Sequence, residues 1–277
     1  MGFRINTNVS SLQARKSIRK VTDDQSKTFA QLSSGQRINV SSDDAAGLAI
    51  SEKLKATIRS EQQAERNTND GISMIQVAEG GLSEVSNTLI RLRELAIQAS
   101  SDTIGQVERG YTDLEYQQLK QEVQRISEVT SFNGTNLLNG QGETLDFQIG
   151  MKNDAFQDRI SYDVGKISAG LEALGLSGIS LENKETSQNS LENLDAAIQN
   201  ISGQRATLGA LQNRLSTTSQ NLQTSMENFS AANSRIRDVD YAEATANNAK
   251  NNILTQAATS VLGQANSAGS GALRLIG

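Results

Sequence analysis

Apolar and small residues recur every three or four positions along two long stretches of the chain. The first stretch is residues 72–99. The second is residues 191–236, in which Arg205 and Thr218 occupy two of the apolar positions. This spacing places the apolar side chains on one face of a helix, with a period close to that of a coiled coil. At about 1.5 Å per residue the second helix spans roughly 70 Å. The pattern predicts a mainly α fold, a long antiparallel coiled-coil or helix-bundle rod.

Two shorter helices are expected beside these long ones. Residues 41–44 have the spacing of a capping box ahead of apolar positions in 45–58, and residues 112–115 have the same spacing ahead of 119–129. Residues 100–110 are expected to form the turn that precedes the second of these short helices.

A β-hairpin is expected at about residues 140–165. The dipeptides at 133–134 and 139–140 are both Asn-Gly, which is typical of tight turns. Two runs then alternate between apolar and polar residues, as strands with one buried face do. The alternating residues are Leu145, Phe147 and Ile149 in the first run, and Ile160, Tyr162 and Val164 in the second. Because a two-stranded ribbon is not stable alone, its apolar face is expected to pack against the helices.

Sparse apolar stripes run along both ends of the chain, and each is too weak to hold a lone helix. Pairing of the two stripes with each other alone would give a marginal two-helix hairpin. Packing against the ends of many other copies would bury both stripes and order them on assembly. The residues proposed for assembly are Ile5, Val9, Leu12, Ile18, Val21, Phe29 and Leu32 at one end, and Val239, Ala246, Ile253 and Val261 at the other.

The composition excludes several kinds of site. The chain has 277 residues and no Cys or His, so disulfides, thiolate chemistry, histidine-based catalysis and the commonest transition-metal ligand are excluded. Its net charge of −5 argues against a nucleic-acid-binding protein. No apolar run reaches the roughly 18 to 20 residues that a membrane span needs. We therefore expect no catalytic residue, cofactor, metal, nucleic acid or membrane insertion.

Two pairs of adjacent carboxylates remain as candidates for sharing a proton or holding a cation. They are Asp23-Asp24 and Asp43-Asp44. Adjacent residues on a helix do not face the same way, so we interpret both pairs as capping groups at helix starts, where the helix dipole favours negative charge.

Four motifs resemble those of bacterial flagellins and occur in the order that the family uses. Residues 32–51 (LSSGQRINVSSDDAAGLAIS) resemble the N-terminal signature, and residues 234–243 (SRIRDVDYAE) resemble the C-terminal one. Residues 93–99 (RELAIQA) and 131–138 (SFNGTNLL) lie between them. The resemblance covers nearly the whole chain. The chain differs from larger flagellins at residues 165–184. These residues lead directly from the hairpin region to the long C-terminal helix and leave no room for variable surface domains.

The resemblance implies a structural subunit that polymerises into the extracellular bacterial flagellar filament for motility. Residues 1–40 with 235–277 would form a terminal inner-core coiled-coil domain that is disordered in the monomer. Residues 41–234 would form an outer helical rod domain that contains the hairpin. The implied partners are other copies of the chain, the flagellar cap, the hook-associated junction proteins and an export chaperone of the flagellar type III route.

The resemblance also implies a contact with an innate receptor. In flagellins that Toll-like receptor 5 recognises, an Arg, a Leu and a Glu on neighbouring helices form the contact patch. The matching positions here are Arg91, Leu95 and Glu122, with Leu89 adjoining. Arg91 and Leu95 are four residues apart and are expected to share one helix face. The alternative is that Leu95 belongs to the bundle seam and Arg91 to its solvated flank.

Two other functions remain open from the sequence. A hook–filament junction protein shares helical termini with flagellin, but it would form a short ring rather than a long filament. A carboxylate-dependent peptidase or glycosidase would need two acidic groups that converge on a cleft, and the chain has no middle domain to hold one.

Overall fold

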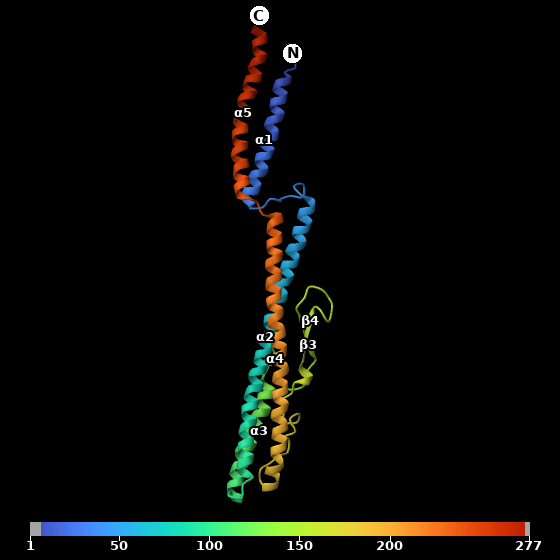
Figure 1. The fold of residues 1–277 in the computed structure, drawn as a ribbon, viewed down its shortest axis with the longest axis vertical. Coiled ribbons are helices and arrows are strands. Elements are labelled where there is room, and N and C mark those ends of the chain that lie inside the picture. The colour runs from blue at the N-terminus through green and yellow to red at the C-terminus, as the bar shows by residue number, and fades with distance from the viewer. Residues whose placement is uncertain (1–6, 275–277) are drawn as a thin grey trace. The chain divides into compact units, whose positions relative to one another are not determined.

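The computed structural model describes the backbone of residues 7–274 and the side chains of residues 7–267 (Figure 1). The helices are α1 (Val9–Ser34), α2 (Ala45–Ala99), α3 (Gln106–Val129), the 3-10 helix η1 (Val164–Lys166), α4 (Lys184–Arg237) and α5 (Tyr241–Arg274). The strands are β1 (Ser131–Phe132), β2 (Thr135–Asn136), β3 (Thr144–Gln148) and β4 (Arg159–Asp163). The predicted mainly α fold with long helices and a small hairpin is confirmed.

The chain is divided into two compact units. The terminal unit is the described part of residues 1–56 and 228–277, and the central unit is residues 57–227. Among the helices within residues 7–274, none combines the length and the apolar character that crossing a membrane requires.

In the terminal unit, α1 and α5 lie side by side and antiparallel (Figure 1). Asn8 caps α1 by accepting a hydrogen bond from the N–H of Ser11 at 3.0 Å, and its side-chain amide donates to the carbonyl of Ala265 on α5 at 2.8 Å. At the other end of α1, Gly35 has a left-handed φ of 70°, and its N–H bonds the carbonyl of Gln31. Polar contacts therefore define the start and the end of α1.

The apolar core of the central unit lies between α2, α3 and α4. The apolar positions predicted in residues 72–99 point inward from α2. On α4, the buried apolar residues repeat every seven positions, which is a coiled-coil period. The fully enclosed side chains include Ile75, Leu82, Leu89 and Leu92 of α2, and Leu194, Ile201, Leu208 and Leu215 of α4. The predicted apolar seams of both long helices are confirmed.

The strands β3 and β4 form the antiparallel hairpin that the alternating pattern predicts. Phe147 pairs with Ile160, and Leu145 pairs with Tyr162. Ile160 and Tyr162 are buried, and β3 lies so close to α2 that a Cβ on Gly71 would be 3.1 Å from the ring of Phe147. The apolar face of the hairpin therefore packs against the helices, as expected.

The helix α2 is continuous over 55 residues. The sequence predicts a short helix up to residue 58 and a separate long helix from residue 72, and that prediction is wrong. Residues 59–71 have no stripe of large apolar residues, but they have no Pro and are rich in the helix formers Arg, Glu, Gln and Ala. Their buried positions include the small residues Ala64 and Thr68, so the helix continues without large core side chains.

The helix α3 begins at Gln106, before the predicted capping box at 112–115. Gly105 is its N-cap and contributes no side-chain cap. Thr112 lies inside the helix, where its hydroxyl donates to the carbonyl of Glu108 at 3.1 Å. The prediction of a helix start at Thr112 is therefore wrong, and the turn expected over 100–110 is shorter than predicted.

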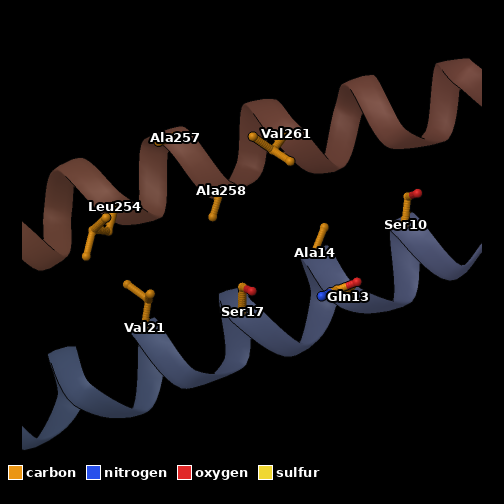
Figure 2. Close-up of a pocket in the computed structure, with 9 residues that line it drawn as sticks. All are labelled: Ser10, Gln13, Ala14, Ser17, Val21, Leu254, Ala257, Ala258 and Val261. Atoms are coloured by element: carbon orange, nitrogen blue, oxygen red, sulfur yellow. The ribbon is translucent and has the colours of Figure 1, made fainter.

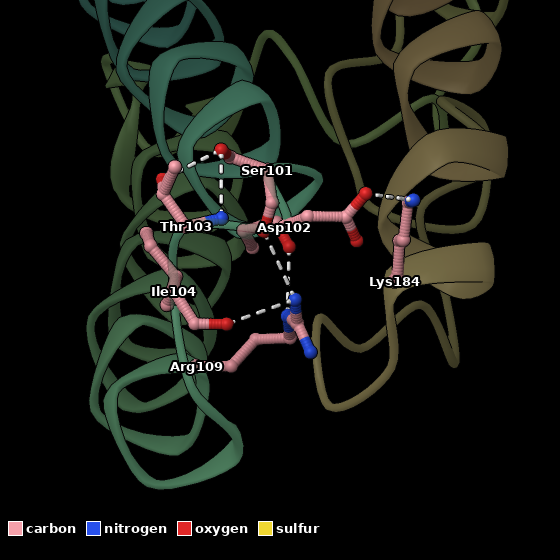
Figure 3. A network of polar contacts seen from close by, with 7 residues as sticks. Ser101, Asp102, Thr103, Ile104, Arg109 and Lys184 are labelled. Atoms are coloured by element: carbon pink, nitrogen blue, oxygen red, sulfur yellow. Dashed lines mark hydrogen bonds and ion pairs between the residues drawn. The ribbon is translucent and has the colours of Figure 1, made fainter.

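A buried arginine closes the turn between α2 and α3 (Figure 3). The Nε of Arg109 donates to the carbonyl of Ala99 at 2.8 Å, and its Nη2 donates to the carbonyls of Ser101 and Ile104 at 3.1 and 3.2 Å. The last carbonyls of a helix have no partner within the helix, so the guanidinium provides the donors that they lack. Nothing in the sequence distinguishes Arg109 from any other charged helix residue.

The adjacent carboxylates have different roles in the two pairs. Asp44 caps α2 by accepting a hydrogen bond from the N–H of Gly47 at 2.9 Å, which confirms its predicted capping role. Asp43 pairs with Lys27 at 2.9 Å, and this hydrogen bond is the main cause that lowers the pKa of Asp43. The pair at 23–24 lies inside α1, so the prediction that it begins a helix is wrong.

Replacing Leu89 by Asp is expected to destabilise the central unit by several kcal/mol, on the order of 3 to 5, because it buries an unpaired carboxylate among apolar side chains. The matched control is Ile90→Asp, because Ile90 is the next residue of α2 and is 47% exposed. Denaturant-induced unfolding of the two variants measures the difference. An equal loss of unfolding free energy in both variants would contradict the burial of Leu89.

Candidate assembly surfaces

The face of α1 that turns toward α5 carries small and polar side chains. Ser11, Ala14 and Thr28 are the buried residues of this helix. The hydroxyl of Ser11 donates to Oδ1 of Asn266 on α5 at 2.8 Å. Burial of apolar surface contributes about 25 cal/mol per Å², and small side chains offer little of it. The contact between α1 and α5 therefore contributes little hydrophobic free energy.

Large apolar side chains lie on the surface of both terminal helices instead. On α1, Val9, Leu12 and Phe29 are 59%, 56% and 53% exposed. On α5, Ile253 and Val261 are 66% and 55% exposed. Apolar side chains that gather on the surface of two paired helices indicate an interaction surface.

The structure separates the residues of the predicted terminal stripes into two groups. Leu12 and Ile18 are six residues apart. Residues on one helix face are three, four or seven apart, so these two side chains lie on different faces of α1. The half-buried group is Ile18, Val21, Leu32 and Val239, and the exposed group is Val9, Leu12, Phe29, Ala246, Ile253 and Val261. Ile5 lies outside the described residues. Ile18, Val21 and Leu32 are thus partly covered in the subunit, and Val239 lies between α4 and α5.

A groove of about 440 Å³ lies between α1 and α5 (Figure 2). Ala14 and Ser17 of α1 lie opposite Ala258 of α5, and these small side chains leave the groove open. The larger Val21 and Leu254 line the same groove. The groove is therefore mostly apolar.

A short backbone bridge joins the segment after α1 to the segment after α4. The N–H of Arg37 donates to the carbonyl of Arg237 at 2.6 Å, and the N–H of Val239 donates to the carbonyl of Gly35 at 3.0 Å. We call this bridge, with the side chains of Arg37 and Arg237, the arginine clasp. It joins residues of the two sequence signatures, 32–51 and 234–243, within the terminal unit.

The side chains of the arginine clasp strengthen the backbone bridge. Arg37 donates from Nη2 to the carbonyl of Ile236 at 2.7 Å, near the end of α4. Arg237 pairs with Glu52 on α2 at 2.5 Å and donates from Nε to Oε1 of Gln36 at 3.0 Å. The clasp thus ties the segments that follow α1 and α4 to the first part of α2. Sequence spacing alone did not indicate these pairs, because their members are about 200 positions apart in the chain.

The residues of the predicted receptor contact have different environments in the central unit. Leu89 and Leu95 are buried in the core. Arg91 is half exposed and pairs with Glu94 and Glu115 at 3.0 and 2.8 Å. The spacing of Arg91 and Leu95 therefore does not place both side chains on an exposed face. Leu95 belongs to the bundle seam and Arg91 to its exposed flank, which is the alternative that the sequence left open.

The fourth residue of that contact, Glu122, lies on α3 and is exposed. It pairs with Arg125 at 2.6 Å, and this hydrogen bond lowers the pKa of the Glu122 carboxyl. Glu115, also on α3, is the main cause that raises the pKa of Arg91. The charged members of the predicted contact are thus Arg91 on α2 and Glu122 on α3, each already engaged in an ion pair within the subunit.

The described residues offer no evident centre for metal chemistry. Within residues 7–274, no three Asp, Glu, His or Cys side chains are grouped so that they could hold a metal ion. The surfaces that remain as candidates for function are therefore apolar faces, the groove and exposed ion pairs.

Two family models match the chain. The bacterial flagellin N-terminal helical region matches residues 5–143, and the bacterial flagellin C-terminal helical region matches residues 191–276. The first match includes the signature at 32–51, and the second includes the signature at 234–243. Together the two matches cover most of the chain.

Several relatives are similar over nearly their whole length. The flagellin of Halalkalibacterium halodurans is 39% identical over 98% of this chain and 99% of its own. A flagellar filament core protein of Brachyspira hyodysenteriae is 40% identical over the same shares of the two chains. The crystal structure of Bacillus cereus flagellin is 32% identical, has a TM-score of 0.51, and matches 57% of this chain and 88% of that one.

Replacing Arg237 by Gln is expected to weaken the arginine clasp by about 1 kcal/mol, because the ion pair with partly exposed Glu52 is screened by solvent. Hydrogen exchange at the N–H groups of Arg37 and Val239 should then be roughly fivefold faster. The matched control is Arg235→Gln, since Arg235 is an exposed residue in the same last turn of α4. Equal exchange rates in the two variants would exclude a role for the Arg237 side chain in the clasp.

Proposed function

The chain belongs to the bacterial flagellin family and is a structural subunit of the extracellular flagellar filament, and we propose that its terminal unit supplies the main contacts between subunits. The protein is not an enzyme, and it polymerises with copies of itself. The observation that carries the proposal is the arrangement of side chains on α1 and α5. The buried side chains of α1 are small or polar, while several large apolar side chains of both helices are exposed.

In the filament, residues 1–40 with 235–277 form the inner-core domain, and residues 41–234 form the outer domain. The position of the arginine clasp supports these boundaries, because it lies where α1 and α4 both end. The connection between η1 and α4 supports an outer domain without variable surface domains. This connection is short, and it packs its own apolar residues Leu174, Leu176 and Leu181 into the core.

Assembly buries the exposed apolar side chains of the terminal unit against other copies. A contact of this kind between unlike faces of two copies generates an open helical filament when its rotation does not close a ring. Full burial of a side chain such as Ile253 contributes about 1.5 to 3 kcal/mol. A terminal unit with a weak contact of its own therefore gains most of its order when it docks, because helices in proteins draw most of their stability from tertiary packing.

The further partners are the flagellar cap, the hook-associated junction proteins and the export chaperone. Family membership supports all three, and so does the exposure of apolar side chains on α1 and α5, which need cover before the subunit polymerises. The alternative function as a hook–filament junction protein is not favoured, because the full-length relatives at 37–40% identity are flagellar filament proteins. The structure of a putative flagellar hook-associated protein from Vibrio parahaemolyticus is 12% identical, so its likeness concerns the fold alone.

Toll-like receptor 5 is a partner of the monomeric subunit through the exposed side chains of Arg91 and Glu122. Exposed charged groups on two neighbouring helices support this assignment, since Arg is a frequent anchor at protein interfaces. Leu89 and Leu95 do not contact the receptor themselves. They are buried in the core, and their packing holds in place the part of α2 that presents Arg91.

Replacing Ile253 by Ala is expected to raise the critical concentration for filament formation by about tenfold or more, because the filament loses apolar burial there. Melting of the isolated subunit should stay unchanged, because the Ile253 side chain is exposed in it. The matched control is Gln256→Ala, which truncates an exposed polar side chain on the same helix. Sedimentation of seeded subunits measures the critical concentration. Normal polymerisation of the Ile253→Ala variant would contradict the proposed surface.

Replacing Arg91 by Ala is expected to weaken activation of Toll-like receptor 5 by monomeric subunits by at least about fivefold, the loss of a contact worth 1 kcal/mol or more. The matched control is Arg93→Ala, because Arg93 lies on the same helix but pairs with Asp195 of α4. A receptor reporter assay on both purified monomers makes the comparison. Equal activation by the wild type and the Arg91→Ala variant would remove Arg91 from the contact.

A further inference from the structure

The central unit contains two Asn-Gly dipeptides whose surroundings differ. Asn133-Gly134 forms the two-residue loop of the hairpin between β1 and β2. Asn139-Gly140 follows soon after β2, in a segment that bridges to Ser168. The two dipeptides have the same chemistry, so a difference in their reactivity would come from the fold alone.

The first dipeptide is exposed and held by few contacts. Asn133 has a φ of 51° and Gly134 a φ of 81°, the values of a two-residue hairpin turn with positive φ at both central positions. Among the described residues, the Asn133 side chain has no hydrogen-bond partner, and a Cβ on Gly134 would meet no atom within 4 Å. Only two residue pairs join β1 to β2, and Phe132 is the one residue of these pairs that packs against the core, so the tip opens with little movement of buried side chains.

The second dipeptide is restrained from several sides. The Oδ1 of Asn139 accepts a hydrogen bond from the N–H of Gln141 at 2.9 Å. A Cβ on Gly140 would lie 2.8 Å from the Cβ of Ser168, so the chain has little room there. The neighbouring residue Leu138 is fully buried in the core. Movement of Asn139 therefore requires movement of core residues, which costs far more free energy than opening a hairpin tip.

We propose that Asn133 is a site of spontaneous covalent modification, deamidation through a cyclic imide, and that the fold protects Asn139 from the same reaction. The backbone nitrogen of Gly134 loses its proton to hydroxide and attacks the side-chain carbonyl carbon of Asn133. The new N–C bond forms, the bond from that carbon to the side-chain nitrogen breaks, and ammonia leaves after taking a proton from water. Water then adds across one of the two imide C–N bonds and gives either aspartate or isoaspartate.

Gly134 favours the first step because it carries no side chain to hinder its nitrogen. The step also needs Asn133 to rotate out of the turn conformation, and the short β1–β2 ladder permits this. The products carry one more negative charge than the net −5 of the chain. Isoaspartate in addition routes the main chain through the former side chain and lengthens the turn. The pairs of Ser131 with Asn136 and of Phe132 with Thr135 are then lost, while the core next to Leu137 and Leu138 remains.

The test compares the two sites in one molecule. The purified full-length chain is incubated in mildly alkaline buffer, and peptide mass spectrometry follows the loss of the side-chain amide at each Asn-Gly site. Transfer of a labelled methyl group by an isoaspartate-specific methyltransferase identifies the isoaspartate product. A parallel sample in concentrated urea reports the reaction of the same two sites in the unfolded chain.

In the native chain, Asn133 is expected to react at least about tenfold faster than Asn139, and in urea the two rates are expected to agree within about threefold. The variant Asn133→Gln should lose most of the early isoaspartate signal, because ring closure by Gln is slower. Equal native rates at the two sites, a faster native reaction at Asn139, or reaction at neither site in the native chain would each overturn the proposal. None of these outcomes depends on filament formation.

Discussion

Burial of one apolar seam between α2, α3 and α4 is the interaction on which the rest of the central unit depends. Leu89 and Leu92 of α2 and Leu208 and Leu215 of α4 are fully enclosed in it. Each such side chain contributes about 1.5 to 3 kcal/mol on burial, and the sum is set against the large conformational entropy of long helices. The hairpin of β3 and β4 and the connection that precedes α4 pack against the same seam. They need it because neither is large enough to form a core of its own.

The terminal unit has the same helical backbone but lacks such a seam. The buried side chains of α1 are Ser11, Ala14 and Thr28, while Leu12 and Ile253 remain exposed. Because of this difference in the size of the buried side chains, the two units differ in how they are stabilised. The central unit is stabilised within one chain, whereas the terminal unit, on the function that we propose, gains stabilisation from neighbouring copies. A filament subunit needs both properties, because it must exist as a separate molecule before it becomes part of the polymer.

Polar groups determine where the helices end and how the chain turns. Arg109 supplies donors to the carbonyls that follow α2, and Arg37 does the same near the end of α4. Arg237 pairs with Glu52 and also donates to Gln36, and the second contact joins residues of the two signatures. At the tip of the β1–β2 hairpin such support is absent, and the chemistry of Asn133 differs from that of Asn139 for this reason.

The sequence by itself determined the two apolar seams, the hairpin of two alternating strands, the capping role of Asp44 and the family. These features depend on residues that are close together in the chain and belong to one helix, strand or turn. Their spacing in the sequence therefore predicts them. Only the tertiary structure decided that α2 continues through the polar stretch of residues 59–71, and that Leu95 faces the core although Arg91 does not. It also decided which apolar residues of α1 face α5 and which remain free for other copies. Contacts between residues far apart in the chain, such as those of the arginine clasp, leave no periodic trace, because their geometry exists only once the helices have packed.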